Sequence, residues 1–322
     1  MHVSFFYFVV KKIKYCNNKK GGVLMEYTSS DVAITKCLFK KEVNAVLEGL
    51  DLIKASSLIE QKDTVVIVPN WVNKEKPDPE CGVIVGPDTL EAIIKWVKKL
   101  NPKRIVVASG SGGGDTKEVM KKVGYDKIIK KTGVEFIDLN KGPYVDIKLD
   151  HDYPSKIKIN KIYKEMTKLI SFTQLKEHEE ATMSSSIKNI TMSFPSTEEH
   201  GTPKKDGGIH NDLHGFIRAM AQKIKIDISI VSLNPVMVAT GPTKGISRHT
   251  GLVIVGNNPI SVDTVCARML GFKTQGVRYL YELEKRGLKE TDINNINILG
   301  IDLIKAEKIF TDKVFGKKTS VD

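Results

Sequence analysis

Residues 173–216 of this 322-residue chain gather the side chains best suited to acid–base chemistry. The segment reads TQLKEHEEATMSSSIKNITMSFPSTEEHGTPKKDGGIHNDLHGF and holds four of the seven histidines, among lysines and hydroxyl groups. Histidine titrates near neutral pH, and lysine supplies a charge that can hold a carboxylate or a phosphate. We predict that Lys176 and Lys188 hold an anion while His178 or His214 moves protons. Surface histidines without a role are the alternative.

Two of these histidines, His210 and His214, are one helical turn apart. If their helix begins early enough, both share a flank with Arg218; if Asp212 is the N-cap, His210 lies just outside the helix. A metal site needs a third ligand, for which His178, His200, Glu198 and Glu199 are the candidates. The predicted set is His200, His210 and His214. No glutamate stands in an H-E-x-x-H arrangement, so proton transfer or anion binding is the favoured interpretation.

A glycine-rich stretch, SGSGGGDT at residues 109–116, lies between a predicted strand and a predicted helix. Glycines at 110, 112 and 113 allow backbone N–H groups to approach an anion, and the start of the next helix adds positive potential. We therefore predict that Gly110, Gly112 and Gly113 bind a cofactor or phosphate. Asp115 stands where a dinucleotide fingerprint has its third glycine, and a plain flexible turn is the alternative.

Asn70 opens the loop VPNWVNKEKPDPECG, directly after a predicted buried strand. Ligands of open α/β sheets bind beyond the carboxyl ends of the strands. Asn70 is therefore predicted to contact a ligand or cofactor. A surface loop stiffened by its prolines is the alternative interpretation.

The elements that must position these residues follow an alternating pattern from Thr64 onward. Short β-branched runs at 64–68, 103–109 and 134–139 predict buried strands. An amphipathic stretch at 86–100 and a helical stretch at 116–133 separate them. Strands that alternate with helices in this way predict a parallel sheet with right-handed crossovers.

The second half of the chain is predicted to continue the sheet, but its sequence pattern first changes. Residues 141–164 contain short alternating pieces that predict antiparallel or edge strands. Further strands are predicted at 168–175, 227–233, 251–256 and 296–300, and helices at 213–223, 259–270 and 276–286. The sequence therefore predicts an α/β fold with a mostly parallel sheet, either as one elaborated sheet or as two lobes divided near residues 165–175.

Composition narrows the class of protein. The net charge is +12, but no helix-turn-helix or zinc-finger pattern accompanies the basic residues, which favours anionic small molecules over nucleic acid. No apolar run approaches the roughly 20 residues that span a bilayer. The cysteines are too scattered for a zinc or iron–sulfur site and are expected to be reduced thiols of a cytoplasmic protein; they are Cys16, Cys37, Cys81 and Cys266.

The first 24 residues differ from the rest of the chain. HVSFFYFVV is apolar, but its lysines follow the apolar run, the reverse of a secretory signal. KKGGVLM then leads into Met25, which we predict to be the natural start. Residues 1–24 are accordingly predicted to be a non-native or disordered extension, and a small interfacial anchor is the alternative.

Five motifs in order resemble one known family. They are VVIVPNWV, LKEHEEATMSSSIKN, HNDLHGFI, VMVATGPTKG and NNPISVDTVCARMLGF. Together they are similar to domain-of-unknown-function family 362 from about Asn70 to Gly300. The resemblance implies one α/β domain over residues 25–322, with Asn189, Gly241, Lys244 and Asp263 around a cofactor or ligand pocket. For Asp263, capping or orienting its own helix is the alternative.

Departures from the family pattern also have implications. Many family members carry an appended ferredoxin-like module with clustered cysteines, which this chain lacks. No internal iron–sulfur cluster is therefore expected, and any redox role would need an external electron donor. A looser similarity is to the amino-terminal region of lactate racemases, which use a nickel-pincer nucleotide. That similarity implies an organic or metal cofactor near Lys176 or Lys188 with His178 or His200.

Three functions are consistent with these features. The first is an enzyme, an isomerase or an oxidoreductase, that acts on an anionic carboxylate or phosphate by proton transfer or redox chemistry. The second is a non-catalytic nucleotide- or cofactor-binding module that uses the glycine-rich stretch. The third is a sensor or assembly protein whose basic surface binds a macromolecule. The gathering of titratable groups favours the enzyme.

Overall fold

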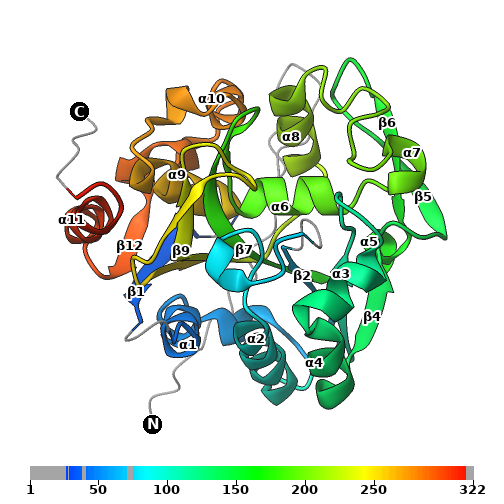
Figure 1. Cartoon of the computed structure of the whole chain (residues 1–322), viewed down its shortest axis with the longest axis horizontal. Coiled ribbons are helices and arrows are strands. Elements are labelled where there is room, and N and C mark those ends of the chain that lie inside the picture. The colour runs from blue at the N-terminus through cyan, green and yellow to red at the C-terminus, as the bar shows by residue number, and fades with distance from the viewer. Residues whose placement is uncertain (1–26, 28, 38–40, 71–74, 317–322) are drawn as a thin grey trace, which may run out of the picture.

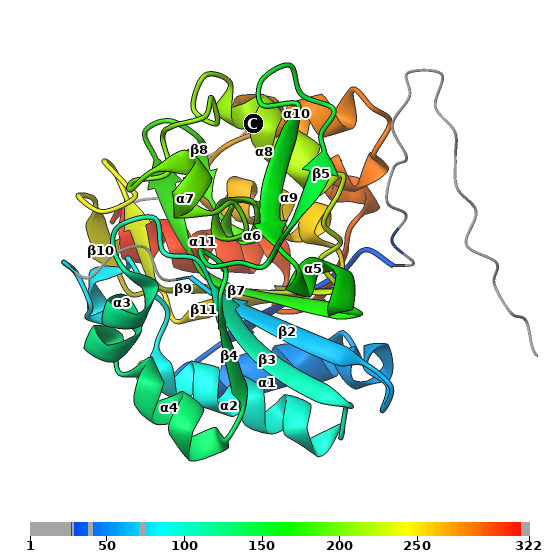
Figure 2. The same ribbon diagram turned by 90° about the vertical axis from the view of Figure 1, so that its right-hand side faces the viewer.

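The computed structural model describes residues 27, 29–37, 41–70 and 75–316, which form an α/β fold. Layers of helices enclose a mostly parallel sheet on both faces (Figures 1 and 2). The predicted extension over residues 1–24 lies outside the described residues. No helix in the described ranges combines the length and the apolar character needed to cross a bilayer.

The main path of the central sheet crosses the whole molecule. Its strands are, in spatial order, β12 (Asn297–Gly300), β1 (Asp31–Lys36), β11 (Leu252–Gly256), β9 (Ile228–Val238), β7 (Lys168–His178), β2 (Thr64–Pro69), β3 (Arg104–Ser109) and β4 (Glu135–Asp138). From β9 through β7, β2 and β3 to β4 all neighbours are parallel, whereas β11 is antiparallel to both β1 and β9. The predicted, mostly parallel α/β sheet is confirmed.

Smaller strands extend this framework. Strand β8 (Thr182–Ser184) pairs with β7, and β10 (Ile246–Arg248) pairs with β9. Strands β5 (Tyr144–Lys148) and β6 (Lys156–Asn160) form a separate antiparallel pair within the region where antiparallel pieces are predicted. Short helices α5 (Ile162–Glu165) and α7 (Thr197–His200) adjoin this pair (Figure 1).

Two helical layers bury the two faces of the sheet. One layer consists of α1 (Val43–Leu52), α2 (Pro87–Lys99), α3 (Thr116–Val123) and α4 (Tyr125–Thr132). The other contains α6 (Ser186–Ser193), α8 (Leu213–Ala221), α9 (Pro259–Met269), α10 (Arg278–Glu284) and α11 (Leu303–Val314).

Strand β2 shows why both layers are required. Each of its residues is buried, and successive side chains of a strand point to opposite faces. Val65 and Ile67 belong to the core shared with α2, whereas Val66 and Val68 belong to the core shared with α6. A continuous β-branched run therefore suits a strand that is covered on both sides.

The predicted helical stretch at 116–133 is two helices rather than one. Helix α3 ends at Val123, and Gly124 follows with φ 84°, in the left-handed region that favours glycine. Helix α4 then begins at Tyr125, whose side chain is buried against the sheet layer. The change of direction at Gly124 allows both short helices to bury their apolar faces.

Strand β7 lies at the centre of the sheet and includes most of the predicted lobe division at 165–175. It pairs with β2 on one side and with β9 on the other. The sheet is thus continuous through this region. Because β2, β3 and β7 are parallel, their carboxyl ends meet at one edge, and there Asn70, the glycine-rich stretch and Lys176 come together.

Candidate functional site

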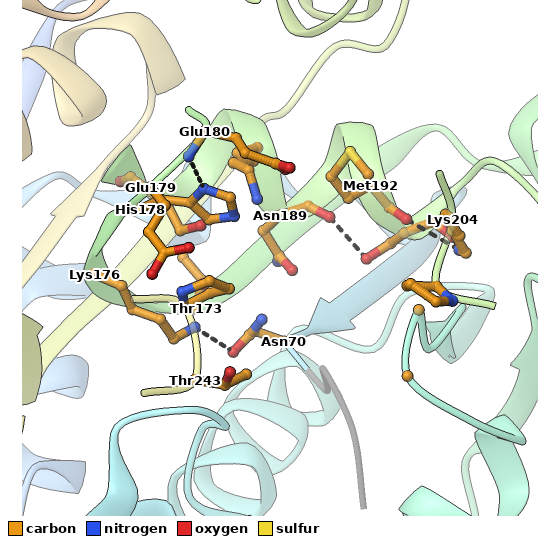
Figure 3. Close-up of a pocket in the computed structure, with 18 of the residues that line it drawn as sticks. Asn70, Thr173, Lys176, His178, Glu179, Glu180, Asn189, Met192, Lys204 and Thr243 are labelled. Carbon is orange, nitrogen blue, oxygen red and sulfur yellow. Dashed lines mark hydrogen bonds between the residues drawn. The ribbon is translucent and has the colours of Figure 1, made fainter. Parts of the chain in front are cut away.

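A cavity of about 330 Å³ lies at this edge, between β7, α6 and the connections that follow β2 and β3 (Figure 3). Nine of the predicted site residues line it: Asn70, Gly110, Gly112, Gly113, Lys176, His178, Lys188, Asn189 and His210. Residues that sequence reasoning did not single out complete the lining, and they include Thr173, Glu179, Glu180, Ser184, Ser185, Met192, Lys204, Lys205, Pro242 and Thr243.

Lys176 carries its amine to the floor of this cavity. Its side chain is 1% exposed, and Nζ donates a hydrogen bond of 3.0 Å to the amide oxygen Oδ1 of Asn70 (Figure 3). An amide oxygen is uncharged, so it compensates the ammonium only in part. Burial, helped by the positive charge of Lys188, lowers the pKa of Lys176 to about 7.

Lys188 enters the same cavity from the first turn of α6. Its side chain is partly exposed, and its amine forms no hydrogen bond or ion pair with the described residues. Desolvation lowers the pKa of Lys188 to about 8, and the negative charge of Glu180 opposes that shift. The cavity therefore contains two amines that titrate near neutral pH.

His178 is held in one tautomer at the end of β7. Its Nδ1 accepts backbone hydrogen bonds from Glu180 (3.1 Å) and Ala181 (3.2 Å), so the ring proton of the neutral imidazole belongs on Nε2. Burial, and then the charges of Lys188 and Lys176, lower the pKa of His178 to about 2. His178 can therefore donate a hydrogen bond through Nε2–H, and its role in moving protons stays a prediction.

A third buried amine, Lys204, was missed by sequence reasoning. Its Nζ donates to the backbone oxygens of Gly110 (2.9 Å), Met192 (3.0 Å) and Ser193 (3.3 Å). Burial lowers the pKa of Lys204 to about 7, while three carbonyl acceptors favour its protonated form. Because Met192 and Ser193 end α6, the ammonium also meets the negative end of that helix. Lys204 therefore ties the glycine-rich stretch to α6.

The rim of the cavity carries a cluster of opposite charges. The Glu180 carboxylate accepts from Lys205 Nζ at 2.9 Å and lies 2.8 Å from Nδ1 of His210. Burial opposes ionisation of Glu180, but the hydrogen bond from Lys205 and the positive charges of His210 and Lys205 lower its pKa. Desolvation lowers the pKa of His210, and Glu180 opposes the shift. Glu180 thus pairs with cations of the rim and not with the buried amine of Lys176.

Helix α6 receives its N-terminal cap from a distant residue. The Asp263 carboxylate accepts from the backbone N–H groups of Ser186 (2.9 Å) and Ile187 (3.3 Å) and from the hydroxyl of Tyr279 (2.8 Å). Burial raises the pKa of Asp263 to about 6, and these donors oppose the rise. Asp263 does not line the cavity; it caps α6, whereas its predicted alternative role concerned its own helix, α9.

Polar side chains pin α6 onto the sheet. The Ser186 hydroxyl donates to the Ser229 hydroxyl on β9 at 2.6 Å. The Asn189 amide donates to the Val68 backbone oxygen (3.0 Å) and to the Ser171 hydroxyl (3.1 Å). Since buried polar groups need partners, these bonds fix the rotation of the helix. The same rotation directs Lys188 and Asn189 to the cavity.

Close packing explains two of the predicted glycines. A Cβ at Gly110 would lie 2.3 Å from the Ser193 oxygen, and one at Gly241 would lie 1.9 Å from the Glu177 oxygen. Gly241 is not a lining residue, although Pro242 and Thr243 are, and the predicted Lys244 is exposed outside the cavity. At the start of α3, the Asp115 carboxylate accepts from Glu118 N, so the protein itself caps that helix.

The predicted metal ligands face different surroundings. Nδ1 of the buried His200 lies 3.1 Å from the Asp206 backbone oxygen, and Nδ1 of His214 accepts from Tyr279 N at 3.3 Å. His210 remains at the cavity rim. Within the described ranges, no group of three or more His, Cys, Asp or Glu side chains could hold a metal ion. The predicted His200–His210–His214 set is therefore not gathered into one site.

The start of α8 accounts for this separation. The helix begins at Leu213, and the Asp212 side chain accepts from Gly215 N as the N-cap. This is the alternative in which His210 lies outside the helix. His214 instead stacks on Tyr279, with ring centroids 6.1 Å apart, and is not among the residues that line the cavity. The predicted catalytic role of His214 stays a prediction.

Comparisons with known proteins agree with the resemblances predicted from the sequence. The family model described as "Domain of unknown function (DUF362)" matches residues 65–268. A thylakoid-associated protein, sll1697, of Synechocystis sp. (strain ATCC 27184 / PCC 6803 / Kazusa) is 21% identical over 235 residues, which are 73% of this chain and 71% of the relative.

A solved structure is also similar. It is the lactate racemase apoprotein from Thermoanaerobacterium thermosaccharolyticum, with 20% identity and a TM-score of 0.38. The match covers 71% of this chain and 54% of the racemase, so this chain spans about half of that protein's length. The likeness concerns the fold alone.

Proposed function

We propose that this chain, which belongs to the DUF362 family through residues 65–268, is an enzyme that binds an anionic small molecule and moves a proton on it. The ligand would be a carboxylate or a phosphate in the cavity between β7 and α6. The observation that carries the proposal is the pair of cavity amines, Lys176 and Lys188, which have no carboxylate partner among the residues that the structure describes.

Electrostatics supports an anionic ligand. Charged groups are rarely buried without a partner, because desolvation is costly. Among the described residues, the amine of Lys176 hydrogen-bonds to an amide oxygen alone, and the carboxylate of Glu180 is already engaged by Lys205. A carboxylate or phosphate that entered the cavity would supply the missing charge and raise the pKa values of both amines.

The titration of the same groups supports proton transfer. General acid–base catalysis is most efficient when the pKa of the catalytic group is near the working pH. Lys176 and Lys188 meet this condition, with pKa values of about 7 and 8. His178 would contribute a hydrogen bond from Nε2–H to a ligand oxygen, because its Nδ1 is occupied by backbone donors.

The alternative is a nucleotide-binding module without catalysis. It is favoured by one observation, that Gly110, Gly112 and Gly113 line the cavity. Binding would then depend on the glycine-rich stretch and would survive loss of the Lys188 charge. The two functions thus differ in which variant abolishes ligand binding.

Thermal unfolding tests the proposal. We expect acetate, pyruvate or inorganic phosphate to raise the Tm of the full chain, and Lys188→Gln to weaken that binding by about tenfold, or ~1.4 kcal/mol. The matched control is Lys62→Gln. The Lys62 side chain is 80% exposed, and Lys62 precedes β2, whereas the cavity lies beyond the carboxyl end of that strand. This control should bind anions as the wild type does.

Catalysis needs a second measurement. In D2O, the wild type should speed deuterium incorporation at an acidic C–H position of a bound ligand, such as the methyl group of pyruvate, as followed by NMR. Stabilisation by nucleotides that persists in Lys188→Gln would favour the binding module. Equal stabilisation of Lys188→Gln and wild type by every anion would contradict the proposed role of the lysines.

A further inference from the structure

We propose that Lys176 acts as a nucleophile that forms a Schiff base with a carbonyl group of the bound anion. This inference rests on the proposed function and narrows its substrate class. The ligands would be small molecules that carry an aldehyde or ketone beside a carboxylate or phosphate, such as 2-oxo acids.

The position of Lys176 is the first argument. Its side chain extends from the central strand β7 and is enclosed on the way to the cavity, so its amine has a fixed location. The hydrogen bond to Asn70 Oδ1 uses one N–H of the amine (Figure 3). The neutral amine keeps its lone pair for attack on an electrophile. A reactive group held in place gains a large effective concentration toward a bound partner.

The protonation of Lys176 is the second argument. Amine nucleophiles are activated by desolvation or by a neighbouring cation, and both conditions are met here, by burial and by Lys188. With a pKa of about 7 against an ordinary 10.5, the neutral fraction at pH 7 is about a thousandfold larger. Exposed lysines of the same chain, such as Lys62, are not desolvated in this way and stay almost fully protonated at pH 7.

Lys188 is suited to the accompanying steps. It lies in the same cavity, its amine has no hydrogen-bond or ion-pair partner in the described part of the chain, and its pKa is about 8. It can hold the anionic group of the ligand, and it can give and take protons. Lys204 is not suited to either role, because its amine already donates to three backbone oxygens.

The reaction balances without an oxidant or a reductant. The Lys176 Nζ lone pair attacks the carbonyl carbon, a C–N bond forms, and the π electrons of the C=O bond move to oxygen. Nζ releases a proton and the oxygen takes one up, with Lys188 as carrier, to give a carbinolamine. The C–O bond then breaks, water leaves with a second proton from nitrogen, and the nitrogen lone pair forms C=N. When it is protonated, this imine acidifies the adjacent C–H bond, as the proposed proton transfer requires.

Borohydride trapping tests this step on the full chain. The protein is incubated at pH 7 with pyruvate, glyoxylate or dihydroxyacetone phosphate and is then reduced, which converts an imine into a stable secondary amine. We expect a mass gain of one ligand less one oxygen atom, mapped to the Lys176 peptide. Labelling there should exceed labelling of the exposed Lys62 peptide by more than about tenfold.

Variants and a competitor define the site. Lys176→Arg should lose the specific label, Lys188→Gln should lower its amount, and Lys62→Gln should leave it unchanged. Because Lys176→Arg can disturb folding of a buried site, competition in the wild type is an independent test. Acetate or inorganic phosphate has no reactive carbonyl and should protect Lys176 from labelling.

The outcomes separate this inference from the proposed function. Absence of a Lys176 label with all three probes, or equal labelling of surface lysines, overturns the Schiff base. If anions still raise the Tm of the wild type and not that of Lys188→Gln, the anion-binding enzyme stands without it. If no anion stabilises the protein and no label forms, both proposals fail.

Discussion

At the scale of single residues, burial decides which groups of the cavity can react. Lys176, Lys188 and His178 lose water on folding, and each is therefore shifted toward its neutral form. Burial thus favours the neutral imidazole of His178 and raises the neutral fraction of both amines near pH 7.

The shift of Lys176 predicts a specific dependence of stability on pH. The unfolded chain keeps this lysine protonated up to about pH 10.5, and the folded protein releases the proton near pH 7. Between these values the unfolded state binds more protons, so the free energy of unfolding rises with pH. Lys176→Met removes this effect and should raise that free energy at pH 7.

The free energy of unfolding is expected to rise by about 3 kcal/mol at pH 7. The lowered pKa of Lys176 corresponds to about 5 kcal/mol, and loss of the hydrogen bond to Asn70 offsets part of it. At pH 10 the gain should fall to about zero. Chemical denaturation at both pH values measures it, with Lys62→Gln as the control. A gain that is equal at pH 7 and pH 10 would show that the titration of Lys176 is not its cause.

Residue identity alone could indicate some of these groups and not others. Lys176 and His178 end a buried apolar strand, a place where functional side chains are expected in an α/β fold. Lys204 gave no such signal, because TPKKDGG resembles an exposed turn and its acceptors are 11 to 94 residues away in sequence. Protonation states could not be predicted either, since they depend on burial.

At the scale of elements, the connections around the sheet edge are shaped by packing against α6. Gly110 approaches the end of this helix so closely that a Cβ would lie 2.3 Å from the Ser193 oxygen. The neighbouring Gly112 has open space, and a Cβ there would meet only Lys204 Cγ, at 4.0 Å. Substitution of each glycine by alanine therefore distinguishes a position where close packing requires glycine from one where it does not.

We expect Gly110→Ala to lower the free energy of unfolding by about 1–3 kcal/mol, because the helix end or the loop must shift. Gly112→Ala should stay within about 0.5 kcal/mol of the wild type. Urea denaturation of the two variants measures both values. Equal effects of the two substitutions would contradict the packing role assigned to Gly110.

Helices and strands could be predicted where apolar residues follow a clear helical spacing or form a continuous β-branched run. The strands at 64–69 and 104–109 and the helix at 87–99 follow patterns visible in the sequence. The break at Gly124 was missed, since amphipathic spacing continues on both sides of it. The start of α8 was left open between two choices, and the Asp212 cap decides it by excluding His210 from the helix.

At the scale of the whole molecule, one sheet joins both halves of the chain. Strand β7 pairs with β2 from the first half and with β9 from the second, and the helical layers pack on both sides of it. Local patterns could not choose between one sheet and two lobes, because the β7–β9 and β1–β11 pairings join residues far apart in sequence.

The continuous sheet predicts a single cooperative unfolding transition for the described domain. Opening either half would expose the apolar faces of β7 and break its hydrogen bonds to the other half. Near-UV and far-UV circular dichroism should therefore give coincident thermal curves. Two resolved transitions, with a saturating anion moving only one of them, would indicate separable lobes.

The placement of Lys176 on an inner strand also has a consequence for divergence. Lys176 belongs to a strand that is hydrogen-bonded on both sides, whereas the mouth of the cavity is built from separate connections such as 109–116 and 239–245. Changes in those connections can alter which molecule is admitted while the amine keeps its place. Related proteins with this fold could therefore differ in substrate while they retain the same lysine chemistry.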